Sequence, residues 1–446
     1  MKTDIEKPRL KTLSDYRPQM AQCVKCGLCR AHCPVFAERG RETAVARGKI
    51  TLAQALLDGD IGPDDKVAKS LSQCLLCGTC ARHCPNQVPV DSVVLAARRE
   101  LAAHRGRSLF GRGLAAVLRR PRLMQMLAFG VPRLASLLFR RVPRQSGLRL
   151  RFSTPLLSRQ RSLPAFARKS FRRSHAEFIA GAPTRPVVAL FTGCMINYIY
   201  PKVGEGALRA LTAVGFHVVI PKDQGCCGLP ALSAGDGDTA RELAANNLRA
   251  FSRHDLAHIV TLCASCHSGM TRYFRDLGPA YEKLSERVTD IHSLLVDEGL
   301  ETTLRDLPRP ATAPGAALHL PCHLQHDARQ AAAPGRLLDA LAGIERVPMD
   351  KSEACCGLGG TFSLYHYPTS RRLGAIKAEA FRRSGAGRLV TACPGCIMQL
   401  QDSLDQAGLP QRACHVLELL GEALEEAHQP ARTNSSDPTR AEKREL

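Results

Sequence analysis

The sequence predicts a multidomain fold in which a small α-helical domain is followed by two tandem α/β repeats. The 446 residues exceed the length of one ordinary domain. Two four-cysteine runs of identical spacing lie within residues 16–105. Residues 184–425 then carry one pattern of five cysteines twice, about 130 residues apart. In both copies the pattern falls among alternating strand-like and helix-like stretches, which is typical of α/β domains.

The composition indicates that the cysteines bind metal. The N-terminus, MKTDIEKPRL, is charged and has no apolar segment like that of a signal peptide, so we expect a cytoplasmic protein. Disulfides are rare in that compartment, yet the chain contains 19 cysteines. Eight belong to the N-terminal runs and ten to the repeats, and Cys414 alone stands outside both patterns. A dense and patterned set of this kind is better explained by metal ligands than by disulfides.

Each N-terminal run has the spacing C-x-x-C-x-x-C-x-x-x-C-P, which is the bacterial ferredoxin pattern for [4Fe–4S] clusters. In that pattern the fourth cysteine of a run ligates the other cluster. We therefore predict one cluster on Cys23, Cys26, Cys29 and Cys84, and a second on Cys74, Cys77, Cys80 and Cys33. Gly27 and Gly78 occupy matching places and permit the tight turns. Zinc is the weaker alternative, since zinc sites take four ligands from paired C-x-x-C units.

The repeats contain an unusual Cys-Cys-Gly sequence in addition to a C-x-x-C pair. The gaps before Cys-Cys are 32 and 33 residues, and those after it are 36 and 37. Adjacent thiolates suit an open cluster better than an ordinary cubane, and Gly228 and Gly357 would let the backbone approach the metal. One zinc per repeat and buried structural cysteines are the alternatives. The predicted ligands are Cys194, Cys226, Cys227, Cys263 and Cys266 in the first copy, and Cys322, Cys355, Cys356, Cys393 and Cys396 in the second.

Apolar runs predict three strands in each copy, with helices between them. The expected strands are 187–191, 216–220 and 258–262, and then 317–320, 344–347 and 388–391. Helices are expected at 204–214 and 238–251, and another at 46–60 in the N-terminal domain. This alternation implies parallel sheets, and each cysteine group follows a strand. Because ligands bind beyond the carboxyl ends of parallel strands, three loops can bring five thiolates together.

The net charge of +21 is concentrated in one segment. Residues 98–173 hold 20 Lys or Arg and a single acid, Glu100. Apolar stretches at 113–118, 123–131 and 134–139 alternate with these arginines, which favours short helices lying on an anionic membrane surface. The alternatives are a solvated linker and docking to an acidic subunit. No nucleic-acid-binding module is visible, and no run of about 20 apolar residues indicates a membrane span.

We expect a ferredoxin domain at 16–105, a basic amphipathic linker at 106–183, cysteine-rich domains at 184–305 and 313–425, and a disordered tail at 426–446. This combination resembles the iron–sulfur subunit of glycolate oxidase and its lactate-oxidising relatives. It is shared by heterodisulfide reductase and by the corresponding iron–sulfur subunit of anaerobic glycerol-3-phosphate dehydrogenase. The stretches ARGKITLAQALLDGD (46–60), PCHLQHDAR (321–329), ACCGLGGTFSLYHYP (354–368) and TACPGCIMQL (391–400) are similar to the glycolate and lactate subunits.

The resemblance implies an electron-transfer subunit of a flavin-dependent glycolate or lactate dehydrogenase. The chain has no G-x-G-x-x-G dinucleotide motif after a strand, so substrate oxidation is expected on an FAD-containing partner, with quinone or another carrier as acceptor. The resemblance to heterodisulfide reductase implies a further cluster in each repeat, of a non-cubane type, and leaves catalytic thiol–disulfide reduction as an alternative. No catalytic residue is assigned. Contact with the cytoplasmic face of the inner membrane is expected to be peripheral.

Overall fold

The computed structural model describes residues 8–106, 109–121, 123–126, 128, 139–141, 147–154, 158–308 and 314–428. Most of the predicted disordered tail lies outside these residues, as do large parts of the apolar stretches 123–131 and 134–139. Within the described ranges, no helix combines the length and apolar character that crossing a bilayer requires.

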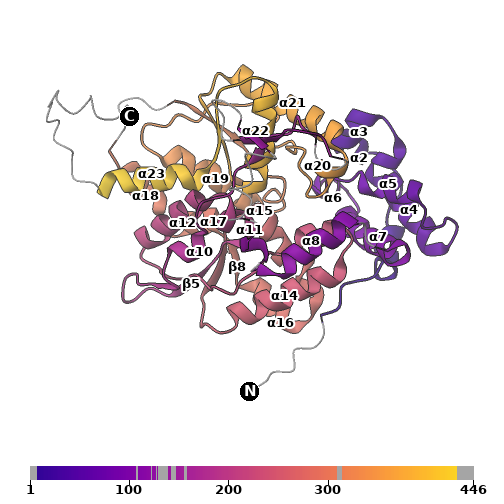
Figure 1. The fold of residues 1–446 in the computed structure, drawn as a ribbon, viewed down its shortest axis with the longest axis horizontal. Helices are drawn as coiled ribbons and strands as arrows, with labels where there is room; N and C mark the ends of the chain where they lie inside the picture. Colours follow the sequence, from indigo (N-terminus) through magenta and orange to yellow (C-terminus); the bar gives the residue numbers. More distant parts are fainter. Residues whose placement is uncertain are drawn as a thin grey trace.

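The N-terminal module is built from short helices around the two cysteine loops. Figure 1 shows these helices, coloured indigo to purple, gathered at one end of the molecule. The elements are η1 (Ser14–Tyr16), α1 (Arg17–Ala21), α2 (Cys29–His32), α3 (Pro34–Arg39), η2 (Glu42–Ala44), α4 (Ala46–Asp58), α5 (Asp65–Ser72), α6 (Thr79–Arg82) and α7 (Val90–Arg105). The helix expected at 46–60 is thus present as α4, and it ends at Gly59, whose positive φ caps it.

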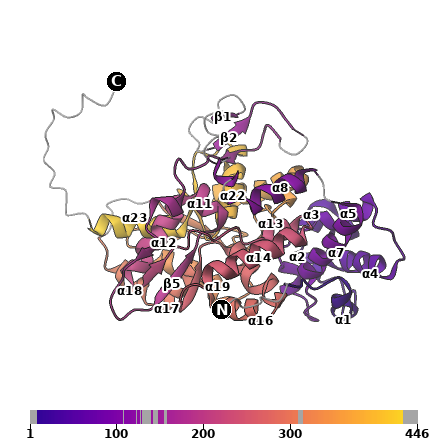
Figure 2. The ribbon, with the colours of Figure 1, turned by 60° about the horizontal axis from the view of Figure 1, so that its bottom comes forward.

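The basic region that follows differs from the expected series of short helices. It contains α8 (Leu109–Arg119), the strands β1 (Phe139–Arg141), β2 (Gly147–Leu150) and β3 (Leu163–Pro164), α10 (Phe171–Ser174) and β4 (Phe178–Ile179). Strands β1 to β3 form an antiparallel sheet that Figure 2 shows projecting above the rest of the molecule. The sheet is anchored because Arg161, 3% exposed, donates to the carbonyl and hydroxyl oxygens of Ser363.

The first repeat has a five-stranded sheet of order β4-β6-β5-β7-β8, in which β4 alone is antiparallel. All three expected strands are present. The elements are β5 (Val187–Phe191), α11 (Gly193–Tyr198), α12 (Pro201–Ala213), β6 (His217–Val219), α13 (Leu229–Ser233), α14 (Gly237–Phe251), β7 (His258–Thr261), α15 (Ala264–Ser268), η3 (Gly269–Tyr273), η4 (Arg275–Leu277), α16 (Pro279–Glu286), β8 (Val288–Asp290), α17 (Ile291–Asp297) and α18 (Leu300–Arg305).

The second repeat has a smaller, parallel sheet of order β11-β10-β9. Its elements are β9 (Ala316–His319), α19 (Ala328–Ala340), α20 (Phe362–Tyr365), α21 (Tyr367–Ser384), β10 (Arg388–Thr391), α22 (Pro394–Gln406), β11 (Ala413–His415) and α23 (Val416–His428). The strand expected at 344–347 is wrong: this stretch makes a single bridge, between Ala316 and Arg346. Pro348 follows directly and has no N–H with which to extend the pairing.

The two repeats pack by exchanging helices. Helix α23 of the second repeat packs on α12 of the first, and α17 of the first packs on α19 of the second. The α12–α23 crossing is close because it contains Gly206 and Gly421. A Cβ atom on Gly206 would lie 1.8 Å from the carbonyl oxygen of Leu417. This exchange sets the cysteine loops of the two repeats against each other.

Candidate metal centres

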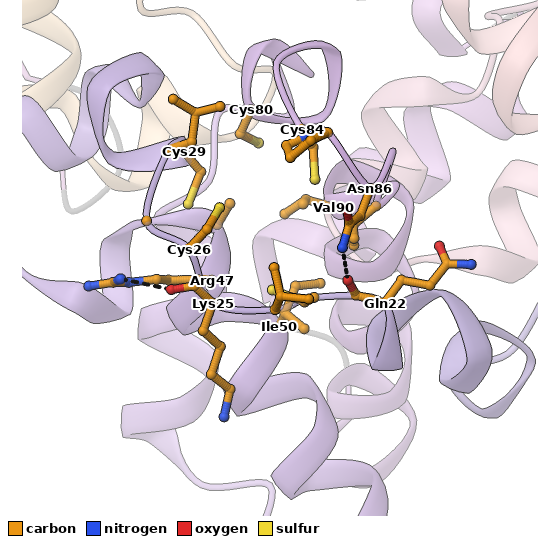
Figure 3. A pocket seen from close by; sticks show the side chains of 17 residues that line it. Gln22, Lys25, Cys26, Cys29, Arg47, Ile50, Cys80, Cys84, Asn86 and Val90 are labelled. Carbon is orange, nitrogen blue, oxygen red and sulfur yellow. Dashed lines mark hydrogen bonds between the residues drawn. The ribbon is translucent and has the colours of Figure 1, made fainter.

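The first pair of predicted ligand sets lies around two adjoining pockets of the N-terminal module. One pocket is lined by Cys23, Cys26, Cys29 and Cys84, with Cys80 at its border. Figure 3 shows Cys26, Cys29, Cys80 and Cys84 around this space, with the Asn86 amide donating to the Gln22 carbonyl beside it. The second pocket is lined by Cys33, Cys74, Cys77 and Cys80. The fourth cysteine of each run therefore faces the three leading cysteines of the other run.

The two loops share one backbone conformation. Lys25 and Leu76, each just before the second cysteine of its run, both have positive φ, and so do Gly27 and Gly78 just after it. A left-handed conformation is costly for lysine or leucine, and it persists where the surrounding structure demands it. The matching pairs curl each loop around its pocket. His32 and His83 stack with ring centroids 3.8 Å apart, in keeping with the structural role inferred for them.

Two buried cations lie beside the second pocket, and sequence reasoning missed both. Lys49 is 1% exposed and donates to the carbonyl oxygens of Thr43 and Ala44 at 2.9 and 2.6 Å. Burial lowers its pKa, although the nearby Cys74 and Cys33 thiols oppose that shift. Arg98 is also buried and donates to the Cys74 carbonyl at 2.8 Å. Positive charges in these places suit a centre with a net negative charge.

In each repeat the five thiols form a continuous series of side-chain contacts in the same order. Loops after separate strands supply them, as the sequence predicts. Burial and hydrogen bonding raise the pKa of the first thiol of each series well above its ordinary value, whereas two donating neighbours lower that of the third. The series are Cys194, Cys226, Cys227, Cys266 and Cys263, and Cys322, Cys355, Cys356, Cys396 and Cys393.

These thiol groups adjoin one another across module boundaries. The Sγ atoms of Cys263 and Cys393, one from each repeat, are 3.8 Å apart. Cys77 of the N-terminal module is hydrogen-bonded to Cys355 of the second repeat. Both lie in one small buried cluster, with Cys33 and Cys322 packed against it. The eighteen patterned cysteines thus run without interruption from the first pocket to the first repeat.

Polar contacts lock the N-terminal module onto both repeats. The Asp91 carboxylate, 1% exposed, accepts from Arg272 at 3.0 Å and from the Tyr273 hydroxyl at 2.6 Å. Arg272 also donates to His326 of the second repeat at 2.8 Å. Burial would raise the pKa of Asp91, but Arg272 and Tyr273 outweigh it and hold the pKa below its ordinary value. The carboxylate is therefore charged and joins three parts of the chain.

The glycines of the two Cys-Cys-Gly sequences serve local conformation. Gly228 and Gly357 have φ of 90° and 94°. A Cβ atom on Gly228 would lie 3.0 Å from the Phe274 ring, and one on Gly357 would lie 3.0 Å from the Ser370 carbonyl oxygen. The nearest obstacles are thus other parts of the chain, so a left-handed turn accounts for these glycines without reference to a metal.

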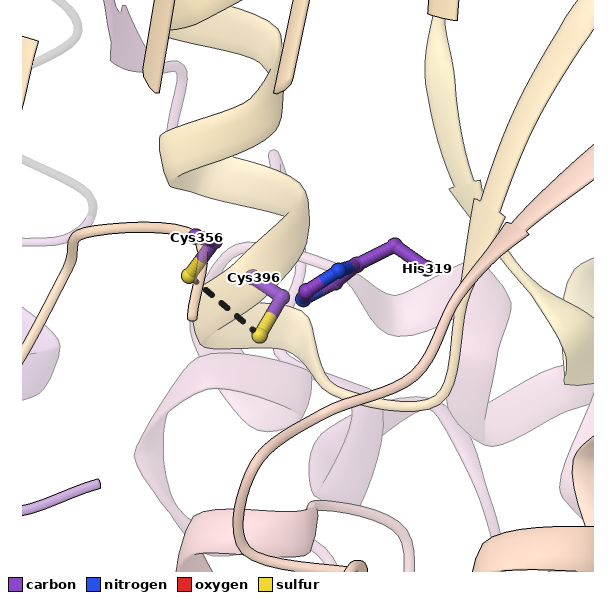
Figure 4. Close-up of side chains that lie close together, drawn as sticks. All are labelled: His319, Cys356 and Cys396. Carbon is purple, nitrogen blue, oxygen red and sulfur yellow. Dashed lines mark hydrogen bonds between the residues drawn. The ribbon is translucent and has the colours of Figure 1, made fainter. Parts of the chain in front are cut away.

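The second repeat has two further polar side chains at its thiols. His319, 1% exposed, lies with Cys356 and Cys396 so that their potential ligand atoms are within 4.8 Å of one another (Figure 4). Lys377, also buried, donates to the Ser352 carbonyl at 3.0 Å, and burial lowers its pKa to about 8. The signal for His319 was its place at a strand end, three residues before Cys322. Nothing in the sequence distinguished Lys377 from other helical lysines.

Cys414 lies apart from every thiol series. It is in β11, and its side chain lines a cavity of about 740 Å³ between the repeats. Burial raises the pKa of its thiol to about 12. It is therefore a structural cysteine by its surroundings.

The residues present fit iron–sulfur clusters by the chemistry of their donors. Each N-terminal pocket is surrounded by four thiols on tight loops, and each repeat gathers five. Burial raises the pKa of Cys33 to about 11 and also raises that of Cys74, so these thiols stay protonated unless something replaces the proton. Metal binding does so, because thiolate is the ligand form.

Comparison with known proteins agrees with this arrangement. A family model described as a 4Fe-4S dicluster domain matches residues 19–88, and one described as a cysteine-rich domain matches twice, at 188–271 and 316–401. The chain is an iron–sulfur protein in which a dicluster ferredoxin domain precedes two cysteine-rich Cys-Cys-Gly repeats.

Relatives place the chain in a family. The probable glycolate oxidase iron–sulfur subunit of Bacillus subtilis (strain 168) is 28% identical over 424 residues, 91% of this chain and 94% of the relative. Lactate utilization protein A of an Exiguobacterium species is 32% identical over 248 residues, 54% of this chain and the full length of the relative. One subunit of the fumarate reductase (CoM/CoB) of Methanothermobacter marburgensis is 27% identical over 406 residues, covering 89% and 71%. The chain belongs to the family that includes the glycolate oxidase iron–sulfur subunit and lactate utilization protein A.

Proposed function

We propose that this chain is the electron-transfer subunit of a flavin-dependent 2-hydroxyacid dehydrogenase acting on glycolate or lactate. It would take electrons from an FAD-containing partner subunit and deliver them towards quinone or another carrier. The observation that carries the proposal is the unbroken series of cysteines, with the Cys77–Cys355 and Cys263–Cys393 contacts at its two junctions. The names of the relatives supply the substrate class.

The ligand sets in this proposal follow the pockets and the thiol series. Cys23, Cys26, Cys29 and Cys84 would hold one [4Fe–4S] cluster, and Cys74, Cys77, Cys80 and Cys33 the other. The five thiols of each repeat would hold one further iron–sulfur cluster. When bound, such clusters accept and donate single electrons. The protein contributes burial, fixed spacing and the buried cations Lys49 and Lys377, which favour added negative charge.

The geometry suggests an order for the centres. Cys26 is exposed, whereas all the repeat cysteines are buried or partly buried. The first ferredoxin pocket therefore forms one end of the series, followed by the second pocket, the second repeat and the first repeat. Removal of two electrons from a 2-hydroxy acid needs a flavin or nicotinamide, and that step would take place on the partner.

The proposal is tested by interrupting the series at its junction. Cys355→Ser should abolish quinone reduction by the assembled complex, while the partner still reduces an artificial dye with its 2-hydroxy acid. Cys226→Ser should have the same effect. Cys414→Ser is the matched control, since this buried cysteine lies outside every series, and it should leave both activities unchanged. Normal quinone reduction by both cluster variants would reduce the repeats to a scaffold and contradict the proposal.

Thiol–disulfide reduction is the second candidate. The observation that favours it is the 3.8 Å separation of Cys263 and Cys393, which places the two repeat centres side by side, as a substrate shared between them would require. Purified chain that reduces a disulfide with a chemical electron donor, and loses this activity in Cys263→Ser, would favour this function. Failure to reduce any disulfide, with quinone reduction intact in the complex, would exclude it.

We also propose peripheral contact with an anionic membrane from the cytoplasmic side. The structure narrows the surface involved, because α8 packs on α13 and α14, buries Ala115 and Leu118, and pairs Arg119 with Glu242. The contact would then rest on exposed arginines such as Arg112 and Arg120. Vesicles containing anionic lipid should float with the wild-type chain at low salt and less well with Arg112→Glu/Arg120→Glu. Equal flotation of both proteins, or none, contradicts this role.

A further inference from the structure

The two repeats differ at the last residue of their first strand. Strand β5 ends at Phe191 and β9 ends at His319, in each case three residues before the first cysteine of the repeat. The register is also the same, since Phe191 pairs with Thr261 and His319 with Thr391, each at the end of the neighbouring strand. Matched positions thus carry a phenyl ring in one repeat and an imidazole in the other.

The surroundings of His319 fix which nitrogen carries the proton. Its Nδ1 lies 3.0 Å from the carbonyl oxygen of Ser352. A carbonyl only accepts hydrogen bonds, so Nδ1 carries the hydrogen and Nε2 presents a lone pair. Among the described residues this buried Nε2 has no hydrogen-bond partner. Metal-binding histidines show this arrangement, with the second nitrogen held by a backbone carbonyl or carboxylate.

The imidazole of His319 is directed at thiols. Figure 4 shows it beside Cys356 and Cys396, whose Sγ atoms are 3.5 Å apart. One ligand atom from each of the three side chains lies within 4.8 Å of the others. Thiolate and imidazole ligands bind metals at about 2.0 to 2.3 Å, so one metal ion can reach all three.

Other buried histidines do not share this geometry. Within the described part of the chain, no other histidine joins two thiols at such short range. His415 has the opposite tautomer, because its Nδ1 accepts from the Leu417 N–H at 3.2 Å and Nε2 must carry the hydrogen. His323 uses both nitrogens, with Ser265 Oγ at 3.0 Å and the Leu76 carbonyl at 3.1 Å.

We propose that Nε2 of His319 is a metal ligand in the second repeat. The centre there has a mixed nitrogen and sulfur donor set, whereas Phe191 leaves the first repeat with sulfur donors alone. This inference rests on the proposed metal centre in each repeat. A neutral imidazole adds no negative charge to the centre, and histidine ligation raises the reduction potential of iron–sulfur clusters. The second repeat should therefore be reduced more easily than an all-thiolate centre in the same place.

The test uses full-length chain labelled with ¹⁵N-histidine, purified and reconstituted without oxygen, then reduced. Pulsed EPR should detect strong hyperfine coupling from a directly bound histidine nitrogen. His319→Gln should remove that coupling, and His319→Cys should remove it while iron content stays within one atom of wild type. His323→Gln is the control, since that ring lies close to the same thiols with both nitrogens engaged, and it should retain the coupling.

The outcomes separate this inference from the proposed function. Wild-type chain with iron in the repeats and no histidine coupling overturns the assignment of His319, as does coupling that persists in His319→Gln. Repeats that contain no metal at all overturn the proposed function first. The wild-type measurement is decisive by itself, so the test survives a variant that fails to fold.

Discussion

Replacing Asp91 with alanine should separate the ferredoxin domain from the repeats. The substitution leaves Arg272 without its counter-ion and the Tyr273 hydroxyl without its acceptor. Breaking a buried ion pair by removing one partner costs 3 to 5 kcal/mol, and since the Arg272 side chain is 29% exposed we expect about 3 kcal/mol. For a domain of 150 to 250 residues this corresponds to a fall in Tm of roughly 6 to 12 °C.

The assay follows thermal unfolding of cluster-loaded, oxygen-free protein by circular dichroism and by visible absorbance. Asp339→Ala is the control, because its pair with Arg346 is about half exposed and should contribute under about 1 kcal/mol. The stabilisation from charged Asp91 is present above the ordinary carboxyl pKa and is lost as the pH falls through the lowered folded value. The gap between wild type and Asp91→Ala should thus be constant between about pH 6 and 8. A fall in Tm no larger than that of the control would refute this reasoning.

Three other substitutions test separate features. Cys84→Ser should remove the cluster at Cys23 and spare its neighbour, leaving about four fewer iron atoms by metal analysis, and loss of the neighbour instead would contradict the crossed pairing. Gly206→Ala forces a Cβ into the Leu417 carbonyl and should lower stability by about 1 to 3 kcal/mol in denaturant unfolding, whereas Gly113→Ala, in open space on α8, should not destabilise. Lys377→Asn removes a buried positive charge and should lower the reduction potential of the second-repeat centre in an EPR-monitored titration; an unchanged value would exclude this electrostatic role.

The sequence was sufficient for features that depend on local spacing. The two ferredoxin runs, the left-handed turns at Gly27 and Gly78, and the strands of the first repeat all follow from short-range patterns. The family was also predictable, because its motifs span most of the chain. Each of these depends on residues close together in the chain, where steric limits leave few choices.

Features that depend on tertiary contact were not predictable. The strand expected at 344–347 has suitable side chains, but only one bridge to Ala316 forms before Pro348. The apolar side of α8 looked suited to lipid, and the fold covers it with α14. His319 became a candidate ligand only when its free Nε2 was found beside two thiols from distant loops. Pairing of Cys77 with Cys355 likewise joins residues almost 300 positions apart.

The central claim is that this chain accepts electrons released by 2-hydroxyacid oxidation. The most direct measurement mixes the reconstituted chain with its copurified flavoprotein partner under anaerobic conditions and follows the visible absorbance of the clusters after glycolate or lactate is added. The account predicts bleaching that requires both the partner and the 2-hydroxy acid, and that dithionite reproduces. Clusters that dithionite reduces but that stay oxidised with partner and substrate present would contradict it.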